Sequence, residues 1–292
     1  PNSIYRLKQS RSPPIGGKMY QVTLNPKAVF MLGMLIFVSV YASWIDRLER
    51  KIYGVKPGVY IEEQKVGGFL PEELEVVLDE LVIRYREMPR NPYLDRETGE
   101  IIPEKYGVEV DVPATYRAVF NAPAHARVRV ITKQVPPLHT ARELEEVNRQ
   151  IGYFHTWFYG SGQRYENITL ALLSINNQIV WPGETFSFNE VVGPRTPERG
   201  YRMAPVIGGD GLGFGGGVCQ VSTTLYNAVL DAGLEVVERH PHSSRVPYVA
   251  PGKDATVVFD ALDFRFRNNT DYPVIIKAGM SRGKISVQII GK

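Results

Sequence analysis

The single cysteine of this 292-residue chain follows three glycines and a valine, in the segment 215–227. Glycines permit a sharp turn and leave space in front of the sulfur, and the residues that follow have the apolar spacing of an amphipathic helix. We therefore expect Cys219 at a helix N-terminus, where unpaired N–H groups and the helix dipole favour the thiolate and could bind an oxyanion. The alternative interpretation is a buried structural cysteine beside a flexible loop.

Two histidines follow the cysteine, within the segment 238–244. A thiol and a histidine that accepts its proton are the minimum set for thiol acyl transfer. In an extended segment His240 and His242 point to the same side, so their spacing does not choose between them. Asp254 is a candidate to orient the base, and its alternative role is that of a turn residue. The histidines and the cysteine lack the spacing of a zinc site, so we expect no metal and no cofactor.

Residues 28–45 form an uncharged, apolar run that is about long enough to cross a membrane as a helix. The preceding tail, residues 1–27, carries basic residues and no acidic residue, so the positive-inside rule places it in the cytoplasm and the rest of the chain outside. The alternative is a cleaved signal peptide. Pro1 is not an initiator and Met19 is a plausible start, so residues 1–18 could be an upstream extension.

The composition limits the partners and the means of stabilisation. The formal net charge of +3 comes from 34 Lys and Arg against 31 Asp and Glu, and the basic tail accounts for the excess. No basic patch is interleaved with aromatic residues in a nucleic-acid reader motif, so we expect a lipid membrane but no nucleic acid among the partners. A lone cysteine cannot form an internal disulfide, so the extracytoplasmic part must rely on ordinary hydrophobic cores.

The part beyond the anchor divides near Pro137 into regions 54–137 and 138–292. The first region has patterns for a strand, turn and strand over 57–69, a helix over 71–81 and strands over 108–112 and 126–131. The second has helix patterns over 141–151 and 166–176 besides the cysteine helix, a short strand within 182–189, and strands over 234–239, 255–259, 264–267, 272–277 and 284–290. The predicted class is α+β: an N-terminal transmembrane helix, a small α+β domain, and a thiol-enzyme-like α+β domain whose cysteine-bearing helix packs on an antiparallel sheet.

Several motifs of the second region, in order and without large gaps, resemble the VanW family; they lie at 182–189, 192–196, 200–201, 204–207, 216–228, 238–243 and 254–257. The resemblance covers roughly residues 150–280, and region 54–137 resembles the peptidoglycan-binding domain that often precedes a VanW domain. The family takes its name from an accessory gene of glycopeptide-resistance clusters, and its domains are associated with L,D-transpeptidase activity on peptidoglycan. The resemblance implies that Cys219 is the nucleophile and favours His242 over His240, because the family motif fixes the second histidine.

The activity implied by the resemblance is the formation of 3-3 cross-links between peptidoglycan stem peptides through a cysteine acyl-enzyme, with carboxypeptidase activity where water replaces the acceptor. Alternative functions are a non-catalytic wall-binding or glycopeptide-resistance accessory protein, and a cysteine peptidase or amidase that acts on the same polymer. Arg195 could bind a stem-peptide carboxylate bidentately or form a structural ion pair. The other substrate-binding candidates are Tyr201, Gly216, Gly217, Gln220, Ser222 and Ser243.

Overall fold

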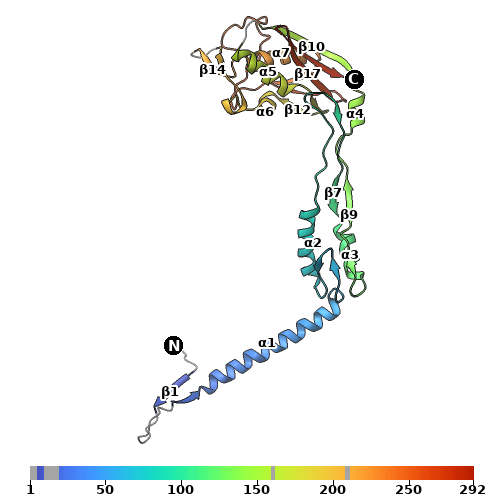
Figure 1. Ribbon diagram of the computed structural model, residues 1–292, viewed down its shortest axis with the longest axis vertical. Coiled ribbons are helices and arrows are strands. Elements are labelled where there is room, and N and C mark those ends of the chain that lie inside the picture. Colours follow the sequence, from blue (N-terminus) through green and yellow to red (C-terminus); the bar gives the residue numbers. More distant parts are fainter. Residues whose placement is uncertain (1–4, 10–19, 159–161, 208–210) are drawn as a thin grey trace. The chain divides into compact units, whose positions relative to one another are not determined.

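The computed structural model describes residues 5–9, 20–158, 162–207 and 211–292 (Figure 1). The chain forms two compact units, Pro1–Glu87 with Val108–Gln134 and Met88–Gly107 with Val135–Lys292. Much of the predicted cytoplasmic tail, including Met19, lies outside the described residues.

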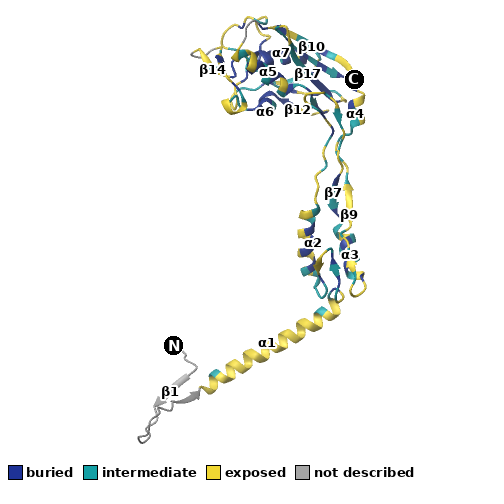
Figure 2. Ribbon diagram, in the orientation of Figure 1, coloured by how far each residue is buried: buried dark blue, intermediate teal, exposed yellow. Residues whose placement is uncertain are grey.

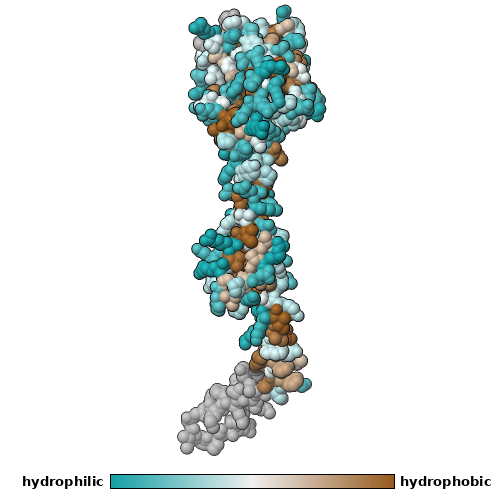
Figure 3. Space-filling view, turned by 90° about the vertical axis from the view of Figure 1, so that its right-hand side faces the viewer, coloured by the Kyte–Doolittle hydropathy of each residue, from teal (hydrophilic) through white to brown (hydrophobic). Residues whose placement is uncertain are grey.

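The first unit begins with the paired strands β1 (Tyr5–Gln9) and β2 (Tyr20–Leu24), followed by the long helix α1 (Pro26–Tyr53). None of the side chains of α1 is buried (Figure 2), and apolar side chains cover the surface next to the grey atoms, where this helix lies (Figure 3). Its length and composition are those of a helix that can cross a membrane, which is compatible with a single-pass anchor or a signal sequence.

The rest of the first unit is a small α+β fold. Strand β3 (Tyr60–Ile61) pairs with β4 (Gln64–Lys65) and with β8 (Arg127–Val128), while β7 (Gly107–Val110) is joined to β9 (Thr132–Val135). Helices α2 (Pro71–Tyr85) and α3 (Val112–Asn121) pack on each other, and the buried core includes Val59, Leu78 and Val119. The helix α3 was not predicted; Asp111 begins it by accepting a hydrogen bond from the N–H of Ala114 at 2.9 Å.

The second unit is organised by the antiparallel sheet β10-β18-β17-β11, which consists of Arg149–Trp157, Lys284–Gly291, Val274–Ser281 and Gln178–Val180 in that spatial order. Helix α7 (Val218–Asp231) packs on β10 and β18, and α5 (Gln163–Ile175) packs on β17 and against α7. The core between them includes Ile168, Leu225 and Val287. The predicted α+β class and the packing of the cysteine helix on an antiparallel sheet are confirmed.

Shorter elements complete this unit. Strands β12 (Thr185–Ser187), β16 (Arg265–Arg267) and β15 (Glu235–Glu238) form a second antiparallel sheet, and β13 (Met203–Pro205) pairs with β14 (Leu212–Phe214). Helix α6 (Phe188–Val192) and the 3₁₀ helix Pro197–Arg199 lie between β12 and β13 in the chain.

The two units change at Gln134 and Val135, close to Pro137, but residues 88–107, which were expected in the first region, lie with the second unit. There β5 (Tyr93–Leu94) and β6 (Ile101–Ile102) form a hairpin, and Leu94 is buried with Val147 and Ile275. The side chain of Asn177 donates hydrogen bonds to the carbonyls of Asp95 and Arg96 at 2.9 and 3.1 Å. These contacts join residues far apart in the chain, so no local pattern indicates them.

Two predicted elements of the second region are also wrong in extent. The helix expected over 141–151 ends early, as α4 (Ala141–Glu145), because Arg149 already pairs with Gly291 in the sheet. The segment 255–259 forms isolated bridges and no strand. The N–H and the carbonyl of Ala255 bind side chains of α7, which replace a neighbouring strand.

The substitution Leu225→Ala should lower the free energy of unfolding by about 2–5 kcal/mol, because it removes a fully buried side chain from the packed face of α7. The matched control is Leu230→Ala on the same helix, whose side chain is 37% exposed and whose effect should be below about 1 kcal/mol. Denaturant unfolding of the full chain in detergent measures both. Equal losses would show that α7 does not pack on the sheet through this face.

Candidate active site

The cysteine lies in the first turn of α7, and the glycines before it set the start of this helix. Gly217 is the N-cap with φ +109°, a backbone conformation that favours glycine, and a Cβ there would lie 2.9 Å from Ile168. The N–H groups of Val218 and Gln220 donate to carbonyls of the glycine turn. Within the described part of the chain, the N–H of Cys219 itself has no acceptor, so it is available to a ligand.

A histidine and an aspartate lie beside the thiol. Nδ1 of His242 lies 2.8 Å from Oδ2 of Asp254, and the same oxygen accepts the backbone N–H of His242 at 2.6 Å. Two contacts to one carboxylate thus hold the imidazole. Its Nε2 is buried, has no hydrogen-bond partner among the described residues, and lies beside Cys219, whose thiol influences the ionisation of the ring. The ring therefore has the tautomer and direction that a base for this thiol needs.

The ionisation of the histidine and the aspartate reflects this arrangement. Burial lowers the pKa of His242, but the neighbouring thiol of Cys219 and the hydrogen bond and charge of Asp254 outweigh it, so the pKa is raised overall. Burial raises the pKa of Asp254, but hydrogen bonds from the backbone and ring of His242 and the charge of Arg239 lower it overall. Asp254 is thus an ionised partner that stabilises the imidazolium form of His242.

The polar side of α7 fixes the segment that carries Asp254. Ser222 donates to the carbonyl of Ala255 at 2.7 Å, and the hydroxyl of Thr223 accepts the N–H of Ala255 at 3.0 Å. One turn further, the amide of Asn227 donates to the carbonyl of Lys253 at 2.6 Å. The helix that presents Cys219 therefore also determines the position of Asp254.

A pocket of about 340 Å³ opens above Cys219 and His242. Among the described residues that line it, Arg164 and Arg195 carry a permanent positive charge and no carboxylate is present, and Tyr248 is kept neutral by burial, which raises its pKa. The pocket adjoins a larger one of about 700 Å³ that shares Arg164, Pro205, Val206, Ile207, Gln220 and Tyr248 with it. Together they form a groove whose charge favours an anionic ligand.

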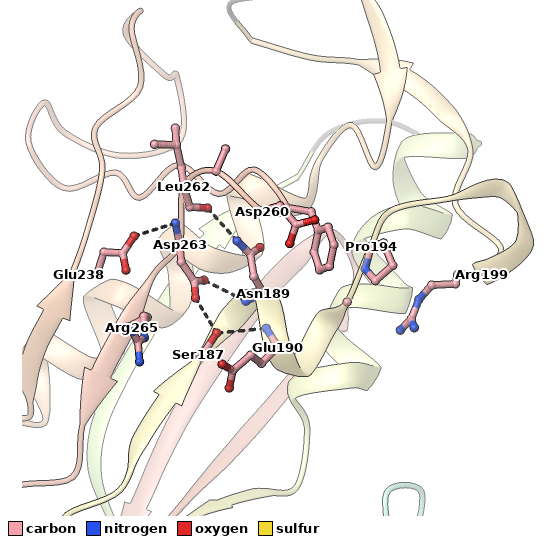
Figure 4. A pocket seen from close by; sticks show the side chains of 13 residues that line it. Ser187, Asn189, Glu190, Pro194, Arg199, Glu238, Asp260, Leu262, Asp263 and Arg265 are labelled. Carbon is pink, nitrogen blue, oxygen red and sulfur yellow. Dashed lines mark hydrogen bonds between the residues drawn. The ribbon is translucent and has the colours of Figure 1, made fainter.

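A third pocket, of about 560 Å³, shares Phe259 with the cysteine pocket and has a different charge (Figure 4). Its walls contain the carboxylates of Glu190, Glu238, Asp260 and Asp263, together with Arg199 and Arg265. Asp263 accepts hydrogen bonds from Ser187 and from the N–H of Asn189, so it holds the turn between β12 and α6.

The other candidates from the sequence differ in their positions. Nε2 of His240 lies 2.9 Å from Glu238 and His240 is absent from the described lining of the cysteine pocket, so the structure brings His242 and not His240 to the thiol. Ser222 is fully buried, Ser243 is exposed, and Tyr201 is buried with an unpartnered hydroxyl. None of these three lines the pocket, whereas Gly216, Gly217 and Gln220 do.

Arg195 lines the cysteine pocket in an unexpected state. Both of its Nη atoms are out of contact with solvent and lack a partner among the described residues, and its guanidinium lies 5.7 Å from the centre of the Phe188 ring. Burial lowers its pKa, although nearby Tyr201 and Cys219 oppose that effect. Neither expected role, a structural ion pair or a directly exposed carboxylate site, describes this buried cation.

Two further groove residues, Arg164 and Tyr248, were not predicted. Arg164 reaches the groove through its contact with Gln220, 56 positions later in the chain, and Tyr248 follows the histidine segment without a motif that marks it. The sequence feature that could have indicated Arg164 is its position: it is a basic residue in the first turn of a helix, where the helix dipole favours acidic residues.

The second unit is thus an α+β fold with a cysteine at a helix start and a histidine–aspartate pair beside it. Residues 163–290 match the model of the family described as VanW like protein. The chain is 40% identical over 236 residues to the uncharacterized protein YoaR of Bacillus subtilis (strain 168), and the matched region covers 78% of this chain and 75% of that protein. It is 30% identical over 131 residues to the vancomycin B-type resistance protein VanW of Enterococcus faecalis (strain ATCC 700802 / V583), which covers 42% of this chain and 47% of that protein. The chain belongs to the VanW family, and no solved structure matches it.

The substitution Asp254→Asn should lower the pKa of His242, because it removes the carboxylate that helps to raise it. An NMR titration of the histidine ring protons measures this change. Asp271→Asn, at an exposed carboxylate, is the control and should leave the titration of His242 unchanged. If His242 titrates in the Asp254 variant as it does in the unaltered chain, the carboxylate does not act on this ring.

Proposed function

We propose that this chain is a peptidoglycan L,D-transpeptidase that forms 3-3 cross-links through an acyl-enzyme on Cys219. The observation that carries the proposal is the arrangement of Cys219, His242 and Asp254 beside a pocket with cationic walls. Membership of the VanW family points to a cell-wall or vancomycin-resistance role, and the site geometry supports a thiol acyl transfer within that role.

In the first half-reaction, Nε2 of His242 takes the thiol proton and the sulfur attacks the carbonyl that joins the third stem residue to the terminal D-alanine. The N–H of Cys219 and the start of α7 stabilise the oxyanion. The carbon–nitrogen bond then breaks, and the proton moves from His242 to the leaving amine. D-Alanine departs and a thioester remains on Cys219.

In the second half-reaction, an amine of a neighbouring stem attacks the thioester carbonyl. His242 takes a proton from the attacking nitrogen, the carbon–sulfur bond breaks, and the new amide leaves. The proton on His242 returns to the sulfur, which restores the starting state. Water in place of the amine gives carboxypeptidase activity with the same residues.

The position of this chemistry in the cell follows from α1. We propose that α1 is an uncleaved anchor with the basic tail in the cytoplasm and the chain from residue 54 onward on the outer side of the membrane, where the wall polymer lies. Region 54–137, which resembles domains that often precede VanW domains, would then contact peptidoglycan.

The full chain in detergent, incubated with muropeptides that carry tetrapeptide stems, should produce dimers that lack one D-alanine, detected by mass spectrometry. Cys219→Ala should abolish dimers and D-alanine release, and His242→Ala should lower the rate by about 10²–10⁴. His240→Ala is the matched control, because this side chain contacts Glu238 and not the thiol.

The products separate the alternatives. Shortened monomers alone indicate a hydrolase, and unchanged muropeptides that remain bound indicate a wall-binding protein. Dimers formed by the Cys219→Ala variant would rule out the nucleophile assignment.

A further inference from the structure

Arg164 occupies the part of the groove that the two pockets share. It extends from the first turn of α5, and a Cβ placed at Gly217 would lie 3.1 Å from its Cγ, so its stem passes over the start of α7. Its guanidinium lies 5.8 Å from the centre of the Phe158 ring, and Nη2 donates to Oε1 of Gln220 at 3.1 Å. Gln220 is in turn fixed by Thr156 and the carbonyl of Trp157, so the arginine rests on a rigid support.

The hydrogen bonds of Arg164 leave most of its donors free. Besides the bond to Gln220, Nη1 makes a long contact of 3.5 Å with the carbonyl of Pro205. A guanidinium has five N–H donors and stays charged in proteins. No carboxylate of the described residues pairs with Arg164, and burial lowers its pKa. A partly buried cation without a counter-ion is unfavourable until an anion binds.

Two nearby or comparable arginines of this unit have carboxylate partners. Arg202 pairs with Glu166 at 3.3 Å and Arg267 pairs with Glu235 at 2.6 Å, although both are about half exposed and need a partner less. Arg164 is more buried and has no carboxylate partner among the described residues, and it also lines an open groove, which is typical of a residue whose partner is a ligand.

Arg195 and Arg164 differ in what they can touch. The Nη atoms of Arg195 are out of contact with solvent, so this residue contributes a positive potential but no direct hydrogen bond unless the glycine turn moves. The side chain of Arg164 lines both open pockets and is not among the buried unpartnered groups. Direct contact with an anion therefore falls to Arg164.

The charge on the opposite side of the cysteine pocket gives an anion its direction. The pocket that shares Phe259 with the cysteine pocket is lined by Glu190 and Asp260, which are exposed and repel a carboxylate; Figure 4 labels both. A substrate with a negatively charged end is thus oriented with that end toward Arg164.

We propose that Arg164 binds the C-terminal carboxylate of an acyl donor whose last peptide bond is the bond that Cys219 attacks. The ligand class is a peptide that ends in a free carboxylate one residue beyond that bond, and the planar guanidinium can donate hydrogen bonds to both carboxylate oxygens. The proposal rests on the proposed function for the reaction, but the binding of the carboxylate is measurable without turnover.

The sole cysteine of the chain provides the readout. Iodoacetamide alkylation of Cys219 in the full chain, followed by mass spectrometry, is measured with increasing N-acetyl-D-alanine, which resembles the leaving residue, and with N-acetyl-D-alaninamide, which lacks the charge. The acid should protect Cys219 with an apparent Kd about 10–100-fold lower than that of the amide. Arg164→Met should raise the value for the acid to that for the amide, and Arg164→Lys should lie between, because it keeps the charge but not the planar fork.

Arg202→Met is the control: it removes a nearby but exposed and paired arginine, and it should keep the preference for the acid. Equal protection by acid and amide, no protection by the acid, or an unchanged preference in the Arg164→Met chain would each overturn the proposal. Thermal unfolding of each variant shows whether it is still folded. A folded Arg164→Met chain that no longer prefers the acid, with Arg164→Lys between it and the unaltered chain, has lost recognition of the carboxylate and not its fold.

A turnover assay separates this inference from the proposed function. Release of D-alanine from a stem tetrapeptide should exceed release of D-alaninamide from its C-terminal amide by a similar ratio in kcat/KM, and Arg164→Met should remove that ratio. Protection of Cys219 without any D-alanine release would refute the transpeptidase and leave the carboxylate site standing. Release from acid and amide at equal rates would refute the carboxylate site alone.

Discussion

The site depends on the hydrogen bonds that the polar side of α7 makes inside the protein. Ser222, Thr223 and Asn227 bind the backbone of residues 253–255 on one side of the helix, and Gln220 and Thr224 bind Thr156 of β10 on the other. These side chains are buried, so each unmade bond would leave a desolvated polar group, and the packed arrangement is favoured over any shifted one. A helix held on both sides in this way gives Cys219 and Asp254 one fixed relation, and His242 takes its position from Asp254.

This constraint explains what the sequence could and could not predict. The glycines, Cys219 and the amphipathic spacing are local features, so the helix, its start and its packing face could be read directly. Ser222 was predicted to bind substrate, and only the tertiary contact shows that its hydroxyl bonds to Ala255. The segment 255–259 was predicted to be a strand from its apolar pattern, but side chains of α7 bind the backbone of Ala255, and Thr256 and Val258 form only isolated bridges. Arg164 was missed because its environment is created by Gln220 and the neighbouring pocket, which no window of sequence contains.

The choice between the two histidines also depends on tertiary contacts that local sequence does not contain. Their spacing puts both on one side of an extended segment, and the structure separates them through different carboxylates. His240 pairs with Glu238, which also accepts the N–H of Asp263, whereas His242 receives both a backbone and a ring contact from Asp254. The bridge between His240 and Thr256 fixes how the histidine segment lies along the segment that follows Asp254. This register places His242 against Asp254 and His240 against Glu238.

The electrostatic design of the groove follows from the same fixed helix. In the proposed reaction, negative charge develops at the sulfur and then at the carbonyl oxygen, beside two arginines without carboxylate partners among the described residues. The guanidinium nitrogens of Arg195 are withdrawn from solvent and its side chain lies against Gly215, so its charge acts at low dielectric. Arg164 remains open, and its charge is neutralised when an anion arrives. In this proposal, a substrate carboxylate supplies the missing counter-ion of Arg164, while Arg195 continues to stabilise the reacting atoms. Binding and catalysis are thus divided between two residues of the same charge.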